Sequence, residues 1–155
     1  MKKTSITDEQ LKMDFNVVNA HTRPLPARLI YDLTCGLLSC ARAEENPVTG
    51  RSYQWFIANM VECCYGVKKP AEGNPRLLTD EGLERLYAQD LNPADLSVYC
   101  VSVLTTVNTA MQNLETADER RFAEGLFVAQ SSLLHGVAEY INEANSKNPT
   151  QKSDS

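Results

Sequence analysis

The segment from residue 26 to residue 67, PARLIYDLTCGLLSCARAEENPVTGRSYQWFIANMVECCYGV, predicts the helical hairpin on which we expect the fold to be built. On both sides of a short polar stretch, apolar side chains recur every three or four residues, as they do on one face of a helix. The stretch ENPVTG at 45–50 contains asparagine, proline and glycine and therefore predicts the connecting loop. We expect two helices, over about 26–44 and 51–66, whose inner faces form part of the core.

Four further helices are predicted outside this hairpin. Their starts are marked by capping residues, such as Thr7 with Gln10 three positions later, and by the pair Asn92-Pro93. The expected ranges are about 7–23, 79–90, 92–114 and 116–145. The turn-rich segment 67–78 predicts a long loop, and the polar tail 146–155 has no apolar periodicity and predicts disorder. The sequence therefore predicts an all-α bundle of about six helices, with one domain over residues 1–145.

The predicted helix over 92–114 carries no charged residue after Asp95. One side of it is apolar, and the opposite side, with Val98, Val101 and Thr105, is uncharged. A helix without charge on either side is usually packed between neighbours. We expect it to be the central helix of the bundle or, as the alternative, part of a self-association surface.

Residues 26–67 and 93–141 repeat one order of features, which suggests two similar helical hairpins. Each segment has an apolar helix, a short polar connection that begins with glutamate, a helix led by arginine and a Gly-Val pair. The aligned pairs are Glu45 with Glu115, Arg51 with Arg121, Gly66 with Gly136 and Val67 with Val137. Duplication of one hairpin is an interpretation that these few identities allow.

The amino-acid composition limits the classes of protein to which this chain can belong. The chain has 155 residues, 43% of them hydrophobic and 23% charged, which is typical of one globular domain. Its net charge of −5 disfavours nucleic acid and anionic membranes as partners, because both bind clustered lysine and arginine. No apolar run follows the N-terminal lysines or reaches the length of a membrane helix. We expect a cytoplasmic protein whose five cysteines are reduced thiols.

No set of residues predicts an active site, a metal site or a cofactor site. Cys63 and Cys64 are adjacent and point about 100° apart on a helix. Cys40 and Cys64 can meet inside the hairpin, but no histidine or carboxylate lies at zinc-ligand spacing beside them. Only two histidines are available as bases, and His135 is expected on a solvent-facing side of the last helix near Glu139. We therefore predict that the protein is not an enzyme.

The surface most suited to binding is predicted on the helix over 51–66. Trp55 lies about 160° from the mean direction of the core residues, and it shares this side with Arg51, Asn59 and Glu62. Tryptophan and arginine together are typical of binding hot spots. We interpret these four residues as a candidate interaction surface. The alternative is that the first helix or the 67–78 loop covers Trp55.

The last predicted helix is apolar over about half of its circumference, which is more than one neighbouring helix needs. One of its two apolar stripes is a candidate self-association face. This stripe consists of Phe127, Leu134, Ala138 and Ile141. Gln130 lies in the middle of the broad apolar side and is expected to satisfy a buried polar group or to lie at a helix–helix contact.

These observations favour a non-catalytic protein–protein interaction or regulatory protein that acts through a helical surface. An acidic chain without catalytic groups suits an inhibitor or immunity-type protein that masks a basic site, and the partner is another protein or a second copy of the chain. A helix–turn–helix interpretation of residues 80–104 fails because no Lys or Arg lies between Arg85 and Arg120. The alternatives are a small-ligand carrier with a pocket inside the bundle and a non-catalytic subunit of an enzyme complex.

Overall fold

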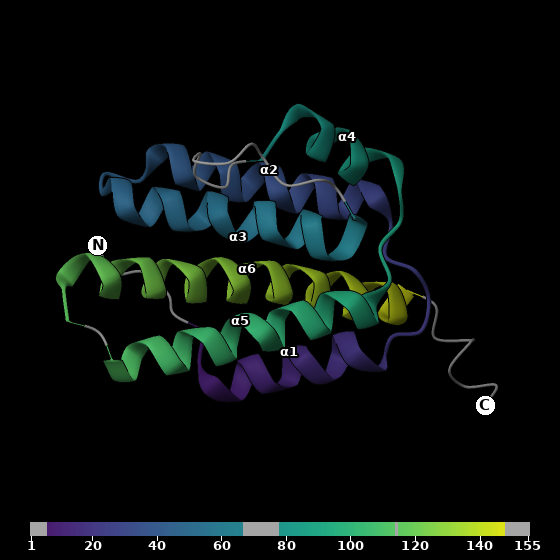
Figure 1. Cartoon of the computed structure of the whole chain (residues 1–155). Coiled ribbons are helices and arrows are strands. Elements are labelled where there is room, and N and C mark those ends of the chain that lie inside the picture. The colour runs from purple at the N-terminus through teal and green to yellow at the C-terminus, as the bar shows by residue number, and fades with distance from the viewer. Residues whose placement is uncertain (1–5, 67–77, 114, 148–155) are drawn as a thin grey trace.

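The computed structural model describes residues 6–66, 78–113 and 115–147, and in these ranges it confirms the predicted all-α fold (Figure 1). Six helices pack into one domain. They are α1 (Asp8–Ala20), α2 (Ala27–Ala43), α3 (Pro47–Tyr65), α4 (Asp80–Ala88), α5 (Pro93–Asn113) and α6 (Ala117–Lys147). No strand occurs in the described part of the chain, and none of its helices has the length and apolar character needed to cross a membrane.

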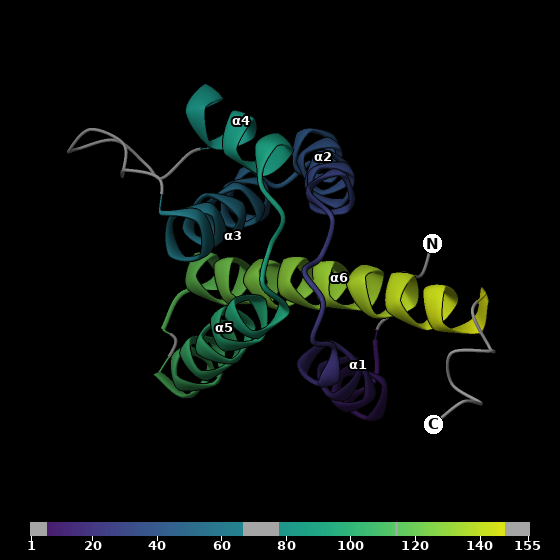
Figure 2. The same ribbon diagram turned by 90° about the vertical axis from the view of Figure 1, so that its right-hand side faces the viewer.

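The 31-residue helix α6 is the centre of the bundle. It contacts α1, α2, α3 and α5. Figure 2 shows α2, α3 and α4 on one side of α6, and α1 and α5 on the other side. The broad apolar side of α6 is thus explained by neighbours within the chain.

The prediction that the helix over 92–114 is the central one was wrong. Helix α5 packs against α1, α3 and α6, but its outer side is exposed, with Val98 at 69% and Val101 at 51% of full exposure. Absence of charge suits both a buried helix and a neutral helix surface. The sequence of α5 cannot separate these two arrangements, and the structure assigns it to the second.

Capping side chains account for the starts of α1, α4, α5 and α6, where the sequence predicts helices. The hydroxyl of Thr7 accepts a hydrogen bond from the backbone N–H of Gln10 at 3.0 Å. At the start of α6, Thr116 accepts from the N–H of Glu119 at 3.1 Å, while the Glu119 carboxylate accepts from the N–H groups of Glu115 and Thr116. These backbone hydrogen bonds lower the pKa of Glu119. Each cap satisfies N–H groups that have no partner within the helix.

Helix α3 begins four residues earlier than predicted, so the expected loop at 45–50 is much shorter. The side chain of Asn46 accepts hydrogen bonds from the N–H groups of Val48 and Thr49, at 2.9 and 3.3 Å, and Pro47 occupies the first helical position. A Cβ added at Gly50 would lie 3.1 Å from the carbonyl oxygen of Ala41, so glycine permits the close approach of α2 and α3. These apparent loop residues form the first turn of the helix.

The segment that connects α1 to α2 forms backbone hydrogen bonds with the segment that connects α4 to α5. The N–H of Leu25 donates to the carbonyl of Leu91 at 2.7 Å, and the N–H of Leu91 donates to the carbonyl of Leu25 at 2.9 Å. Both leucine side chains are buried. Figure 2 shows the two connections running side by side past α6. This antiparallel bridge joins the two sides of the bundle.

The structure also bears on several smaller predictions about helix ends and aligned glycines. Helix α6 continues through Ser146 to Lys147, two residues into the expected tail, while 67–77 and 148–155 lie outside the described residues. Gly66 ends α3 in the left-handed conformation, with φ 73°, but Gly136 lies inside α6 against Leu33. The aligned glycines therefore have different roles, and duplication of the hairpin stays a prediction. Tyr87 is 58% exposed, and its ring contacts the ring of Tyr31.

Candidate functional site

Trp55 stands at an apolar groove between α3, α5 and α6. The indole ring is half-buried and meets the ring of Phe122 edge to face, with ring centroids 6.0 Å apart. The groove has a volume of about 510 Å³. Its apolar lining consists of Trp55, Val107, Ala110, Phe122, Ala123 and Leu126. Its polar lining consists of Thr106, Thr109, Asn113 and Glu119. We call this feature the Trp55 groove.

The four residues predicted as an interaction surface differ in exposure, and three of them are partly covered. Arg51 is exposed, but Trp55, Asn59 and Glu62 are half-buried, and the side-chain amide of Asn59 donates to the carbonyl of Trp55 at 2.9 Å. Helix α3 contacts α2, α4, α5 and α6, so its packed surface is not one stripe. The prediction assumed one stripe and therefore placed Trp55 opposite the core. Phe122 of α6 covers part of the indole, and α1 does not contact α3.

The predicted self-association face lies mainly in the core of the single chain. Leu134, Ala138 and Ile141 are at most 2% exposed, and Phe127 is half-buried. They pack among the helices around α6 and do not present a free surface. Gln130 is also fully buried, as expected. Its amide donates to the hydroxyl of Ser131 at 2.9 Å, and its carbonyl oxygen has no hydrogen-bond partner among the described residues.

A buried carboxylate missed in the sequence joins α1 to α6. Asp14 is 2% exposed, and its Oδ2 lies 3.0 Å from Nδ1 of His135, a half-buried residue on α6. The amide of Gln10 donates to the other oxygen of Asp14 at 2.9 Å. Nε2 of His135 lies 3.3 Å from the exposed carboxylate of Glu139. His135 was expected to be solvated beside Glu139; the contact with Glu139 is present, but the opposite ring nitrogen is paired inside the protein.

The contacts of His135 fit a structural link between helices better than a catalytic base. General acid–base catalysis needs a ring nitrogen within reach of a substrate. In His135 both ring nitrogens already face carboxylates, those of Asp14 and Glu139. We therefore assign the group a structural role in holding α1 against α6. Among residues 6–66, 78–113 and 115–147, no three His, Cys, Asp or Glu side chains are placed to hold a metal ion.

The cysteines differ in exposure, which predicts their reactivity. Cys40 and Cys63 are exposed, whereas Cys64 faces the Asp95 carbonyl of α5 and Cys100 is fully buried. Burial raises the pKa of Cys64 to about 12, so about one molecule in 10,000 is a thiolate at pH 8. We expect iodoacetamide to modify Cys40 and Cys63 in the native protein, and Cys64 and Cys100 only after unfolding. Peptide mass spectrometry checks this; equal rates at Cys64 and Cys40 would contradict it.

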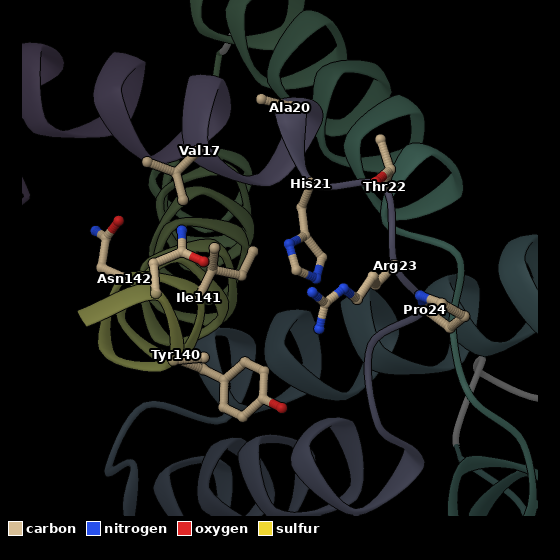
Figure 3. Close-up of a pocket in the computed structure, with 11 residues that line it drawn as sticks. Val17, Ala20, His21, Thr22, Arg23, Pro24, Tyr140, Ile141 and Asn142 are labelled. Atoms are coloured by element: carbon tan, nitrogen blue, oxygen red, sulfur yellow. The ribbon is translucent and has the colours of Figure 1, made fainter. Parts of the chain in front are cut away.

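A polar pocket of about 530 Å³ lies between the ends of α1 and α6 (Figure 3). Figure 3 shows the side chains of His21 and Arg23 close together, on the same side of the pocket, with Tyr140 across from them. Partial burial and the charge of Arg23 lower the pKa of His21. Because both helices present their carbonyl ends here, the positive charge of Arg23 has a structural explanation.

No family model, no curated protein and no solved structure matches this chain. Function is therefore argued from the surface itself. The Trp55 groove combines an apolar lining, an aromatic pair and access from solvent.

Proposed function

We propose that the protein is a non-catalytic protein-binding protein that holds an apolar helical segment of a partner in the Trp55 groove. The observation that carries the proposal is that the only tryptophan of the chain lines an open apolar groove beside Phe122. Tryptophan is enriched among the residues that dominate binding energy. An apolar groove between helices is a common receptor for the apolar face of another helix.

The polar edge of the groove supports an occupant that binds through shape and apolar contact. The hydroxyl of Thr106 and the amide of Asn113 already donate to carbonyls within α5, those of Ser102 and Thr109. The Glu119 carboxylate is held by the cap of α6. These groups can border an apolar segment without leaving a charge unpaired. The net charge of −5 favours a partner that is basic around this segment, in keeping with a regulatory or inhibitor role.

Site-specific photocrosslinking in cells that naturally produce the protein tests this proposal. A photoreactive amino acid at the exposed groove residue Thr109 is expected to capture one defined protein, and the same amino acid at exposed Ser39 on α2 is expected to capture none. Adding Ala110→Arg, which places a charge in the groove, should remove the crosslink. Equal capture from Thr109 and Ser39, or capture that survives Ala110→Arg, would contradict the proposal.

A small-ligand carrier is the second candidate, and the size of the groove favours it. The groove volume of about 510 Å³ falls within the range of small-molecule sites. The pocket of a carrier was expected inside the bundle, whereas this groove lies at the surface. Native mass spectrometry of the freshly purified protein separates the candidates. A carrier retains a bound mass that Ala110→Arg removes, whereas a protein-binding protein gives the mass of the chain alone. A role as a non-catalytic enzyme subunit would appear in the identity of the crosslinked partner.

A further inference from the structure

The outer side of α5 forms a regular exposed stripe that the Trp55 groove does not use. Its members alternate at spacings of four and three residues, the spacing of the seam of a coiled coil. They are Ala94, Val98, Val101, Thr105, Asn108 and Gln112, all exposed. We call this stripe the α5 seam. Figure 2 shows no helix packed outside α1 and α5 on this side of the molecule.

We infer that the α5 seam is the contact between two copies of this chain in a homodimer. Charge is the first argument for a second copy. Two chains that each carry a net charge of −5 repel one another, so they approach most easily where the surface is neutral. On α5 the only charged residue is Asp95, in the first turn, and the rest of the helix is neutral.

The shape of the surface beside the seam is the second argument. A shallow groove of about 430 Å³ runs between α1 and α5. Val98 and Val101 form one wall, and Phe15, Asn16 and Asn19 form the other. A two-fold dimer requires one patch that is complementary to itself. Here a valine ridge and a neutral groove lie side by side, so the ridge of each copy can occupy the groove of the other.

The size of the patch sets the expected strength. A 21-residue helix is about 32 Å long, and with the adjoining side of α1 the surface amounts to on the order of 500 Å² per copy. The total of about 1,000 Å² lies at the lower limit of specific interfaces. The dimer is therefore expected to dissociate on dilution, with a dissociation constant in the micromolar range.

Sedimentation velocity across a wide range of protein concentration tests the inference. The wild-type chain is expected to change from monomer to dimer as its concentration rises. Val101→Glu places two like charges in the seam and should raise the dissociation constant by at least about 100-fold. Val128→Glu is the matched control, because Val128 is an exposed valine on α6 outside the seam, and it should dimerise like the wild type. A mixture of Val101→Glu with Val101→Lys should form a heterodimer.

Three outcomes would overturn the inference: a wild-type chain that stays monomeric, a Val101→Glu chain that still dimerises, or a Val128→Glu chain that loses the dimer equally. Circular dichroism checks that each variant folds. Val98→Glu, at the more exposed seam position, replaces Val101→Glu if the latter misfolds. The seam and the Trp55 groove share no residue, so loss of one function leaves the other measurable.

Discussion

Replacing His135 with alanine is expected to lower the free energy of unfolding by about 1–3 kcal/mol, because it leaves a buried carboxylate without one of its hydrogen-bond partners. Asp14, on α1, is 2% exposed, and after this change the amide of Gln10 would be its one remaining side-chain partner among the described residues. The loss should appear as a lower midpoint in urea unfolding. Helix α1 should loosen first, since the pair joins it to α6.

Two further variants show whether the buried pair is the cause. Glu139→Gln removes the exposed carboxylate on the other ring nitrogen and should cost less than about 0.5 kcal/mol. Asp14→Ala combined with His135→Ala removes both members and should be less destabilising than the sum of the two single changes. If His135→Ala and Glu139→Gln have equal small effects, the contact between Asp14 and His135 does not stabilise the protein.

The second large effect is expected at Gly125, where α6 crosses α3. A Cβ added there would overlap Oγ of Ser52 and lie 3.1 Å from the Cβ of Ser52. Ser52 is fully buried, and its hydroxyl donates to the carbonyl of Thr49 at 2.8 Å, so moving it breaks that bond. Gly125→Ala is expected to reduce the free energy of unfolding by about 1–3 kcal/mol, despite the better helix propensity of alanine. Thermal and urea unfolding measure the change.

Gly36 provides the matched control for this substitution. It lies within α2, and a Cβ added there meets no atom within 4 Å. Gly36→Ala should therefore stabilise the protein by about 0.5–1 kcal/mol through helix propensity alone. Adding Ser52→Ala to Gly125→Ala removes the closest contact and should recover part of the loss. An equal gain from both glycine substitutions would show that α3 and α6 do not meet at Gly125.

The sequence predicted the number and approximate limits of the helices because these depend on neighbouring residues. Thr7, Thr79 and Asn92 cap helices as expected, and Gly66 ends one. The start of α3 was misplaced because Asn46-Pro47 was interpreted as a break, although the same pair caps and opens a helix. Local chemistry thus defines most elements and misassigns one boundary.

The candidate site was less predictable because it depends on which helices meet. Trp55 was singled out, but Phe122, its aromatic partner, comes from a helix far along the chain. The contact between Asp14 and His135 joins residues 121 positions apart, and no local pattern indicates it. The neutral side of α5 was noticed, but its exposure depends on the position of α6. The sequence contains the residues that form these features, but it does not indicate which of them contact one another.

The central position of α6 also bears on the order in which the chain is made. A ribosome synthesises α1, α2, α3 and α5 before α6, yet each of these four helices packs against α6. Until α6 emerges, their apolar faces have no central helix to cover them. The nascent chain therefore lacks a completed core until α6 has been made and is open to aggregation or chaperone capture in that interval. Completion of this core depends on the last of the described helices.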